Sequence, residues 1–252
     1  MKRILSILLT TILLSAVCSI AVIAQTKVDA EHVIVYSGND RFAGWPANCA
    51  AAIFPGDEII TGFIEGGVEV DDGHNLAEPY TNWLARSKDG GRSWKAWDPE
   101  HYVGDFGDQP ELKKLSKPLK FNSGDFVMRI VGTAYHGAND PRAHFFYSND
   151  RGNSWNGPYA FNGFDPMEYS GKYKLTELTP RTDYLVTGKR ECIVFFSARE
   201  EGVFGSDRLF CIKTTDGGQH FEFLGWVIKP FREQDKQDVR KVDLYDNKER
   251  NP

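Results

Sequence analysis

The sequence predicts an all-β fold, and three observations support this prediction. A motif of the form Ser/Thr-x-Asp-x-Gly-x-x-aromatic occurs three times, as SKDGGRSW, SNDRGNSW and TTDGGQHF. The copies start at positions 87, 148 and 214, so the steps between them are 61 and 66 residues. Each copy lies between two runs rich in β-branched and aromatic residues, and no stretch has the pattern of a long helix. Self-similarity at a near-regular period is typical of repeat architectures.

Each copy of the motif has the composition of a tight turn between antiparallel strands. The Asp side chain can accept hydrogen bonds from the backbone N–H groups of its own turn. The glycine two residues later can adopt a positive φ without steric strain. The aromatic residue starts the next strand and can bury its ring against a neighbouring unit. The motif residues are Ser87, Asp89, Gly91, Trp94, Ser148, Asp150, Gly152, Trp155, Thr214, Asp216, Gly218 and Phe221.

Further strand-like runs precede each motif. The first unit contains HVIVYS, WPANCAAAIF, EIITGFI and TNWLARS, the second DFVMRIVGTAY and AHFFYSN, and the third TDYLVTG, ECIVFFSA and RLFCIKT. We therefore expect about four short antiparallel strands in each unit. Units of this kind cannot bury both faces alone, so we expect them to stack radially as the four-stranded blades of a β-propeller.

Composition and charge narrow the classes of partner. Of the 252 residues, 41% are hydrophobic and 26% charged, a balance that supports a packed core. The formal charge is −5, and without Lys2 and Arg3 the chain has 28 basic and 35 acidic residues, a charge of −7. Because this balance offers no basic surface for phosphates, we expect no nucleic-acid partner. No motif indicates a cofactor or a metal site, so none is expected.

The first residues predict export. Lys2 and Arg3 precede an apolar run that reaches Ala24 without an acidic residue, so we predict a signal peptide over residues 1–24, cleaved before Gln25. The mature protein would be secreted or periplasmic, with no membrane contact after cleavage. Two alternatives stay open, namely an uncleaved membrane anchor and a lipoprotein attached at Cys18.

Three cysteines remain after residue 24, and their spacing fits no metal site. Cys192 and Cys211 lie in two strand-like runs that could pair as a hairpin. In an exported protein these two residues could form a disulfide, or they could be two buried thiols. We expect Cys49 to be buried as a small apolar residue.

The three motifs resemble the Asp-box (BNR) repeats of the sialidase-like, or neuraminidase, superfamily, and the resemblance covers residues 31–228. It implies a six-bladed type of propeller with structural Asp boxes at its periphery. Since we expect three to four blades, in residues 25–230, the ring would be incomplete. Residues 231–252 would be a charged tail or the truncated start of a further blade. Three explanations stay open: a truncated or frame-shifted product, association of two half-rings through exposed blade faces, and a smaller open assembly.

Three arginines lie near strands that we expect to line the central cavity, namely Arg41, Arg129 and Arg181. Converging guanidinium groups would bind a carboxylate in bidentate fashion, whereas the alternative is ordinary ion pairs at blade edges. The resemblance implies that Arg41, with Pro46 after it, belongs to the arginine triad that binds the carboxylate of sialic acid. We expect Arg41→Ala to weaken binding of acidic sugars and to leave the melting temperature nearly unchanged.

The resemblance also places an acid/base aspartate on a loop of the first blade. The candidates are Asp71 and Asp72, with Glu65 before them, and the alternative is a solvated acidic loop. His74, with Tyr80 close by, is a further catalytic candidate, because propellers of related fold that cleave uronic-acid or rhamnose linkages use a histidine. Its alternative is an ordinary surface histidine.

The family's nucleophile is a tyrosine activated by a glutamate, both from late blades. Tyr184, next to Asp183, falls in the third unit and does not match it. The leading hypothesis is an exported sialidase-like glycoside hydrolase acting on glycans with a carboxylated sugar, sialic or uronic acid. It would be inactive if the late-blade catalytic residues are missing. The alternatives are a non-catalytic glycan-binding or scaffold propeller, and a gene fragment without activity.

Overall fold

The computed structural model describes residues 30–70, 75–99, 102, 111–132, 142–164, 175–200 and 208–228. The chain divides into Met1–Val33 and Ile34–Pro252, and every strand belongs to the second unit. All strand pairs are antiparallel, and within the ranges given the only helix is a short 3-10 turn. The predicted all-β class is therefore confirmed. The predicted signal peptide and charged tail lie outside these ranges, within which no helix is long and apolar enough to cross a membrane.

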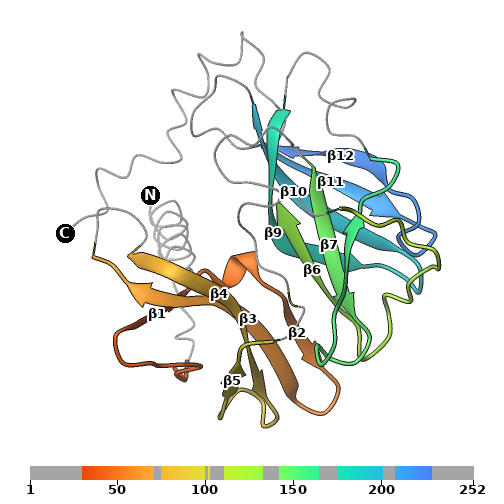
Figure 1. Ribbon diagram of the computed structural model, residues 1–252. Helices are drawn as coiled ribbons and strands as arrows, with labels where there is room; N and C mark the ends of the chain where they lie inside the picture. The colour runs from red at the N-terminus through yellow and green to blue at the C-terminus, as the bar shows by residue number, and fades with distance from the viewer. Residues whose placement is uncertain are drawn as a thin grey trace, which may run out of the picture. The chain divides into compact units, whose positions relative to one another are not determined.

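The strands of the described residues form three sheets that follow one another along the chain (Figure 1). In sheet 1, β3 and β4 are central, β5 forms one edge, and β1 and β2 share the other. Sheet 2 has the order β6-β7-β8, and sheet 3 the order β9-β10-β11-β12. The bounds are β1 Arg41–Gly44, β2 Ala51–Phe54, β3 Glu58–Val68, β4 Leu76–Ser87, β5 Lys95–Trp97, β6 Val127–Gly132, β7 Ala143–Ser148, β8 Asn156–Ala160, β9 Leu175–Val186, β10 Cys192–Glu200, β11 Arg208–Thr214 and β12 Glu222–Ile228.

Sheets 1 and 3 have the four strand positions that the sequence predicts. In sheet 1 the first position is divided, because β1 pairs with β3 at Ile64–Gly67 and β2 pairs with it at Glu58–Thr61. The 3-10 turn Pro46–Asn48 lies between β1 and β2. Sheet 2 has three strands within the described part of the chain.

Each repeated motif forms the turn between the last two strands of its sheet. In sheet 2, Ser148 Oγ donates to Asp150 Oδ1 at 2.7 Å and accepts the N–H of Gly152 at 2.8 Å. Asp150 Oδ1 also accepts the N–H of Ser154 at 2.9 Å. The other two turns repeat these bonds around Asp89 and Asp216. The Asp carboxylate and the Ser or Thr hydroxyl thus both accept hydrogen bonds from the backbone N–H groups of the turn.

The turns require two successive residues with positive φ. Gly90–Gly91 and Gly217–Gly218 fill these positions in sheets 1 and 3. In sheet 2 the first position is Arg151, with φ 60°. Its guanidinium pairs with Glu58 of sheet 1 and with Asp125, both at 2.6 Å. These ion pairs connect the second turn to sheet 1 and offset the backbone strain of a non-glycine residue at this position.

A second repeated contact aligns the three sheets residue by residue. A backbone N–H of each motif turn donates to a carbonyl in the segment just before β3, β6 or β10, at 2.9 Å in every case. The pairs are Gly90 to Asp57, Arg151 to Asp125, and Gly217 to Arg190. Asp57, Asp125 and Arg190 are therefore equivalent positions of the repeat.

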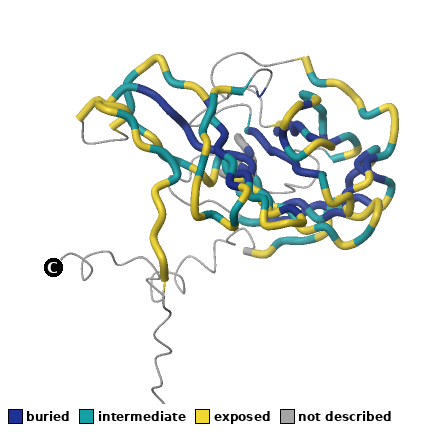
Figure 2. The backbone as a smooth tube through the Cα atoms, turned by 90° about the horizontal axis from the view of Figure 1, so that it is seen from below, coloured by how far each residue is buried: buried dark blue, intermediate teal, exposed yellow. Residues whose placement is uncertain are grey.

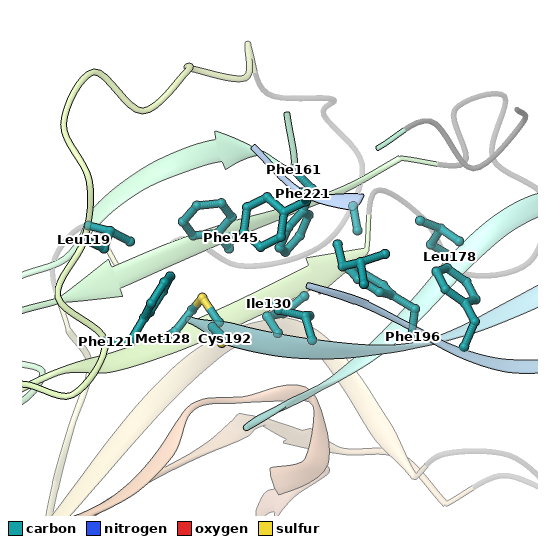
Figure 3. Packing of buried hydrophobic residues seen from close by; sticks show 14 of the residues in the cluster. Leu119, Phe121, Met128, Ile130, Phe145, Phe161, Leu178, Cys192, Phe196 and Phe221 are labelled. Carbon is teal, nitrogen blue, oxygen red and sulfur yellow. The ribbon is translucent and has the colours of Figure 1, made fainter. Parts of the chain in front are cut away.

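Side chains alternate along β6, and each face of this strand packs on a different sheet. Val127 and Val131 join a buried cluster with Ile60 and Leu84 of sheet 1. Met128 and Ile130 join the larger cluster with sheet 3, in which Phe145 packs near Phe221 (Figure 3). Figure 2 shows the backbone coloured by burial, with the buried residues in dark blue. Sheet 2 therefore lies between sheets 1 and 3, as stacking of repeated units requires.

Candidate functional site

One polar cluster of sheet 1 consists of Arg41, Glu65 and Tyr36, and we call it the Arg41 cluster. Arg41 of β1 makes a bidentate ion pair with Glu65 of β3, from Nε to Oε1 at 2.5 Å and from Nη2 to Oε2 at 2.6 Å. The Tyr36 hydroxyl donates to Glu65 Oε1 at 3.1 Å. The side chain of Arg41 is 40% exposed and that of Glu65 only 5%. A buried carboxylate thus holds an accessible guanidinium in one orientation.

The local sequence explains this geometry. Arg41 lies opposite Gly67 and Ala43 lies opposite Glu65, so the two charged side chains share one face of sheet 1. The β3–β4 pairing is irregular between Glu65 and Gly67. A side chain at Gly66 would collide with Leu76. Glycine is therefore required directly beside Glu65, where the strand bends.

Electrostatics keep the cluster ionised. Hydrogen bonds from Arg41 hold the pKa of Glu65 below its ordinary value despite burial, which acts in the opposite direction. The hydrogen bond to Glu65 raises the pKa of Arg41. Burial, followed by the hydrogen bond to Glu65, raises the pKa of Tyr36. Removing Arg41 would leave a buried charge without its partner, so the expectation of an unchanged melting temperature for Arg41→Ala has to be revised.

Arg129 does not belong to a ligand-accessible site, and the prediction that it binds substrate is wrong for this structure. Its side chain is fully buried between sheets 1 and 2. Nη2 donates to Asn82 Oδ1 at 2.7 Å, and the guanidinium lies 4.5 Å from the centroid of the Tyr102 ring. The alternation along β6 places residue 129 on the face toward sheet 1, together with Val127 and Val131. Arg129 therefore has a structural role in the contact between these two sheets.

Arg181 is exposed and lies in an irregular part of β9. The β9–β10 register shifts between Phe195 and Ser197, and the next residue, Thr182, has φ 48°. Thr182 Oγ1 accepts the N–H of Ile130 at 3.2 Å and donates to the Ile130 carbonyl at 2.9 Å. The Thr182 hydroxyl thus satisfies the backbone edge of β6, and this contact sets the path of the chain at Arg181.

The predicted acid/base candidates Asp71, Asp72 and His74 lie outside the described residues. The strand ends that flank them belong to the β3–β4 hairpin, in which Val68 pairs with Leu76. Gly67, one residue earlier, pairs with Arg41 of β1. The hairpin therefore ends at the same end of sheet 1 as the Arg41 cluster.

Tyr184 is held in the packing between sheets 2 and 3. Its hydroxyl accepts the N–H of Met128 at 3.2 Å, and burial raises its pKa to about 12. A phenol with a raised pKa is a weaker nucleophile at neutral pH than one with an ordinary pKa. Asp183, its exposed neighbour, pairs with Phe195 of β10. The arrangement agrees with the expectation that Tyr184 does not match the family's nucleophile.

Cys49, Cys192 and Cys211, the cysteines in the described part of the chain, are free thiols. The predicted hairpin forms, as β10 and β11, but Cys192 lies opposite Thr214 and Cys211 opposite Phe195. Since three positions separate Cys192 from Phe195, the two thiols lie on opposite faces of sheet 3 and cannot form a disulfide. Cys49 is buried, as expected, and its Sγ lies 3.7 Å from Asn82 Oδ1. Across the described ranges, no three His, Cys, Asp or Glu side chains gather as a metal site would require.

Comparison with known proteins finds similarity among solved structures only. No protein-family profile matches the chain, and no curated protein is detectably similar to it. Among solved structures, it is similar to a crystal structure of a protein of unknown function from Dyadobacter fermentans, with a TM-score of 0.45 and 18% identity. The match covers 80% of this chain and 55% of that protein, so the chain spans little more than half its length.

The partners that surround the arginines were not predicted from the sequence. Glu65 was considered only as a residue preceding the acidic loop, although GFIEGG places an acid directly before two glycines in an apolar strand. Tyr36 lies upstream of β1 in a run that we read only as a strand. The role of Thr182 gave no local signal, because its partner Ile130 is 52 residues away.

Proposed function

We propose that sheets 1, 2 and 3 are successive blades of a sialidase-like β-propeller, and that the protein acts on glycans outside the cell. Three features support the proposal. The Asp-box turns recur at the same place in each sheet. Equivalent carbonyls accept a hydrogen bond from each turn. The sheets stack in chain order through apolar faces. The location outside the cell rests on the signal peptide predicted for residues 1–24.

The proposed ligand is the carboxylate of an acidic sugar, sialic or uronic acid, and the Arg41 cluster is the observation that supports this most. Two guanidinium nitrogens of Arg41 bind Glu65, and its 40% exposed side chain leaves donors that can face a ligand. Because Glu65 is buried and fixed, the guanidinium is oriented before a ligand arrives, which lowers the entropy lost on binding. Arg181 would be a second contact, and Arg129 would have none.

Hydrolysis is the proposed activity, with Asp71, Asp72 or His74 giving a proton to the leaving oxygen. The hairpin that carries them ends at the strand positions beside Arg41. A non-catalytic glycan-binding propeller is the second candidate. One observation favours this second candidate. Tyr184, the tyrosine that lies next to an acid in the third unit, is buried, hydrogen-bonded to Met128 and has a raised pKa, so it is not suited to act as a nucleophile. The catalytic nucleophile would then have to come from elsewhere.

The test compares the wild type with two variants by calorimetric titration with sialic acid and with glucuronic acid. The double variant Arg41→Ala/Glu65→Gln removes the cation and also neutralises the buried carboxylate, so it should stay folded. We expect it to bind at least about tenfold more weakly, the loss of one charge-assisted contact. Glu65→Gln alone keeps the cation and should retain part of the affinity. Equal affinity of the wild type and the double variant would contradict the proposed site.

A second set of variants separates a hydrolase from a binding module. A hydrolase should release a chromophore from an aryl sialoside or an aryl uronide, and Asp71→Asn, Asp72→Asn or His74→Ala should abolish the release without preventing sugar binding. Binding without release by the wild-type chain would favour the second candidate. If the wild-type chain neither binds the sugars nor releases the chromophore, both candidate functions are ruled out.

A further inference from the structure

Both halves of a recurring interface are present in this chain, one at each end of the row of sheets. At the contact between sheets 1 and 2, Ile60 and Leu84 meet Val127 and Phe146. At the contact between sheets 2 and 3, side chains of β6 and β7 meet those of β10 and β11 in the same way. Sheet 2 thus has one face that packs on the preceding sheet and one that packs on the following sheet.

The repeated carbonyl positions identify equivalent residues on the outermost faces. Counting from Asp57 and Arg190, Ile59 is equivalent to Cys192, and Ile60 to Ile193. Ile53 pairs with Ile59 and Val186 pairs with Cys192, so Ile53 and Val186 occupy one position of the repeat. By the same pairing, Ala52 and Leu185 occupy the next one.

Exposure differs sharply within each equivalent pair. Val186 packs against the core between sheets 2 and 3, whereas Ile53 is 80% exposed. Ala52 packs against the core between sheets 1 and 2, whereas Leu185 is 53% exposed. The face of sheet 1 that bears Ile53 therefore has the pattern of a face that meets a preceding sheet. The face of sheet 3 that bears Leu185 has the pattern of a face that meets a following sheet.

The aromatic residue of the first motif also indicates that the Ile53 face of sheet 1 lacks a preceding sheet within the described part of the chain. Trp155 and Phe221 are 8% and 1% exposed, because each packs toward the preceding sheet. Trp94, their equivalent in sheet 1, is only partly buried, and its Nε1 donates to the Gly91 carbonyl within its own turn. On this face Tyr36 stacks on Phe63 with ring centroids 5.2 Å apart, and Phe63 is buried, so the exposed apolar surface of this face lies around Ile53.

We propose that this chain associates with a second copy of itself head to tail, the Leu185 face of sheet 3 in one copy packing on the Ile53 face of sheet 1 in the other. A second copy fits these faces because each chain has both complementary faces of an interface that it forms twice internally. Contacts of this heterologous kind close into a ring or extend, depending on the rotation between copies. Glu65 follows Ile59, the partner of Ile53, by six residues along β3, so the Arg41 cluster lies on the same face of sheet 1 as Ile53. The test measures mass and needs no sugar, so its failure can be told apart from a failure of the proposed carboxylate site.

Sedimentation velocity of the purified full chain tests the proposal. We expect the wild type to sediment at twice the mass of one chain or more at micromolar concentrations. Ile53→Glu and Leu185→Glu should each shift it toward the monomer, because each places a charge in an apolar contact. Val70→Glu is the matched control, since Val70 is an apolar residue that is 90% exposed in the segment after β3, outside the strands. It should sediment like the wild type.

A mixture of the two face variants distinguishes head-to-tail contact from other modes. Ile53→Glu retains an intact sheet 3 face and Leu185→Glu an intact sheet 1 face, so an equimolar mixture should form a dimer through one unaltered contact. A monomeric wild type would overturn the proposal, as would a mixture that stays monomeric. Circular dichroism checks that the variants are folded, and Ile53→Ser replaces Ile53→Glu if the latter unfolds.

Discussion

The repeated turn makes a quantitative prediction about Ser148. This side chain is completely buried, accepts the N–H of Gly152 at 2.8 Å and donates to Asp150 at 2.7 Å. Ser148→Ala leaves the buried Gly152 N–H without this acceptor, which costs about 1–3 kcal/mol, and removes a charge-assisted bond worth about 1–2 kcal/mol at a partly exposed carboxylate. We expect a loss of about 2–5 kcal/mol in the free energy of unfolding, or about 4–20 °C in melting temperature.

Ser154→Ala is the matched control in the same turn. Ser154 Oγ donates to the other oxygen of Asp150 at 2.6 Å, but this contact is exposed, so water can replace it. The control should lose less than about 1 kcal/mol. Urea unfolding followed by tryptophan fluorescence measures both variants. If Ser148→Ala costs no more than Ser154→Ala, the turn is not held as we describe.

Three further predictions follow from other parts of the structure. Thr182→Val loses both hydrogen bonds to Ile130 and should destabilise the chain by about 1–3 kcal/mol in urea unfolding, whereas Thr182→Ser should stay close to the wild type. Burial raises the pKa of Asp150, but hydrogen bonds from Ser154 and Ser148 outweigh it and leave the pKa below its ordinary value. Stability from this group should therefore be complete above about pH 4 and fall as the pH drops further, and Asp150→Asn should flatten this dependence in unfolding curves at several pH values. Burial raises the pKa of Cys192 to about 12, so its thiol should react with a thiol reagent at pH 8 only after unfolding, and reducing agent should leave the melting temperature unchanged.

The parts of the fold that could be predicted from the sequence are those encoded locally. The motif around Asp150 contains its own hydrogen-bond partners within a few residues, so its turn geometry follows from residue types alone. The strands around it have the β-branched and aromatic composition of buried strands. Pairings such as β10 with β11 follow because a short connection joins neighbouring strands.

The site was less accessible to prediction because its contacts are distant in sequence. Arg41 and Glu65 are 24 residues apart, and Arg129 and Asn82 are 47 apart. An arginine on a strand looks the same in sequence whether it faces a cavity or a neighbouring sheet. Only the alternation of β6 between two sheets shows that Arg129 is buried, and this depends on the stacking of the sheets.

The most direct test of the central claim is a comparison of sialic acid with its methyl ester, measured as binding to the wild-type chain by titration calorimetry. The two ligands differ only in the carboxylate that Arg41 is proposed to bind. We predict that the acid binds at least about tenfold more tightly than the ester, and that Arg41→Ala/Glu65→Gln removes this difference. Equal binding of acid and ester, or a preference that survives in the double variant, would contradict the assignment of the Arg41 cluster as a carboxylate site.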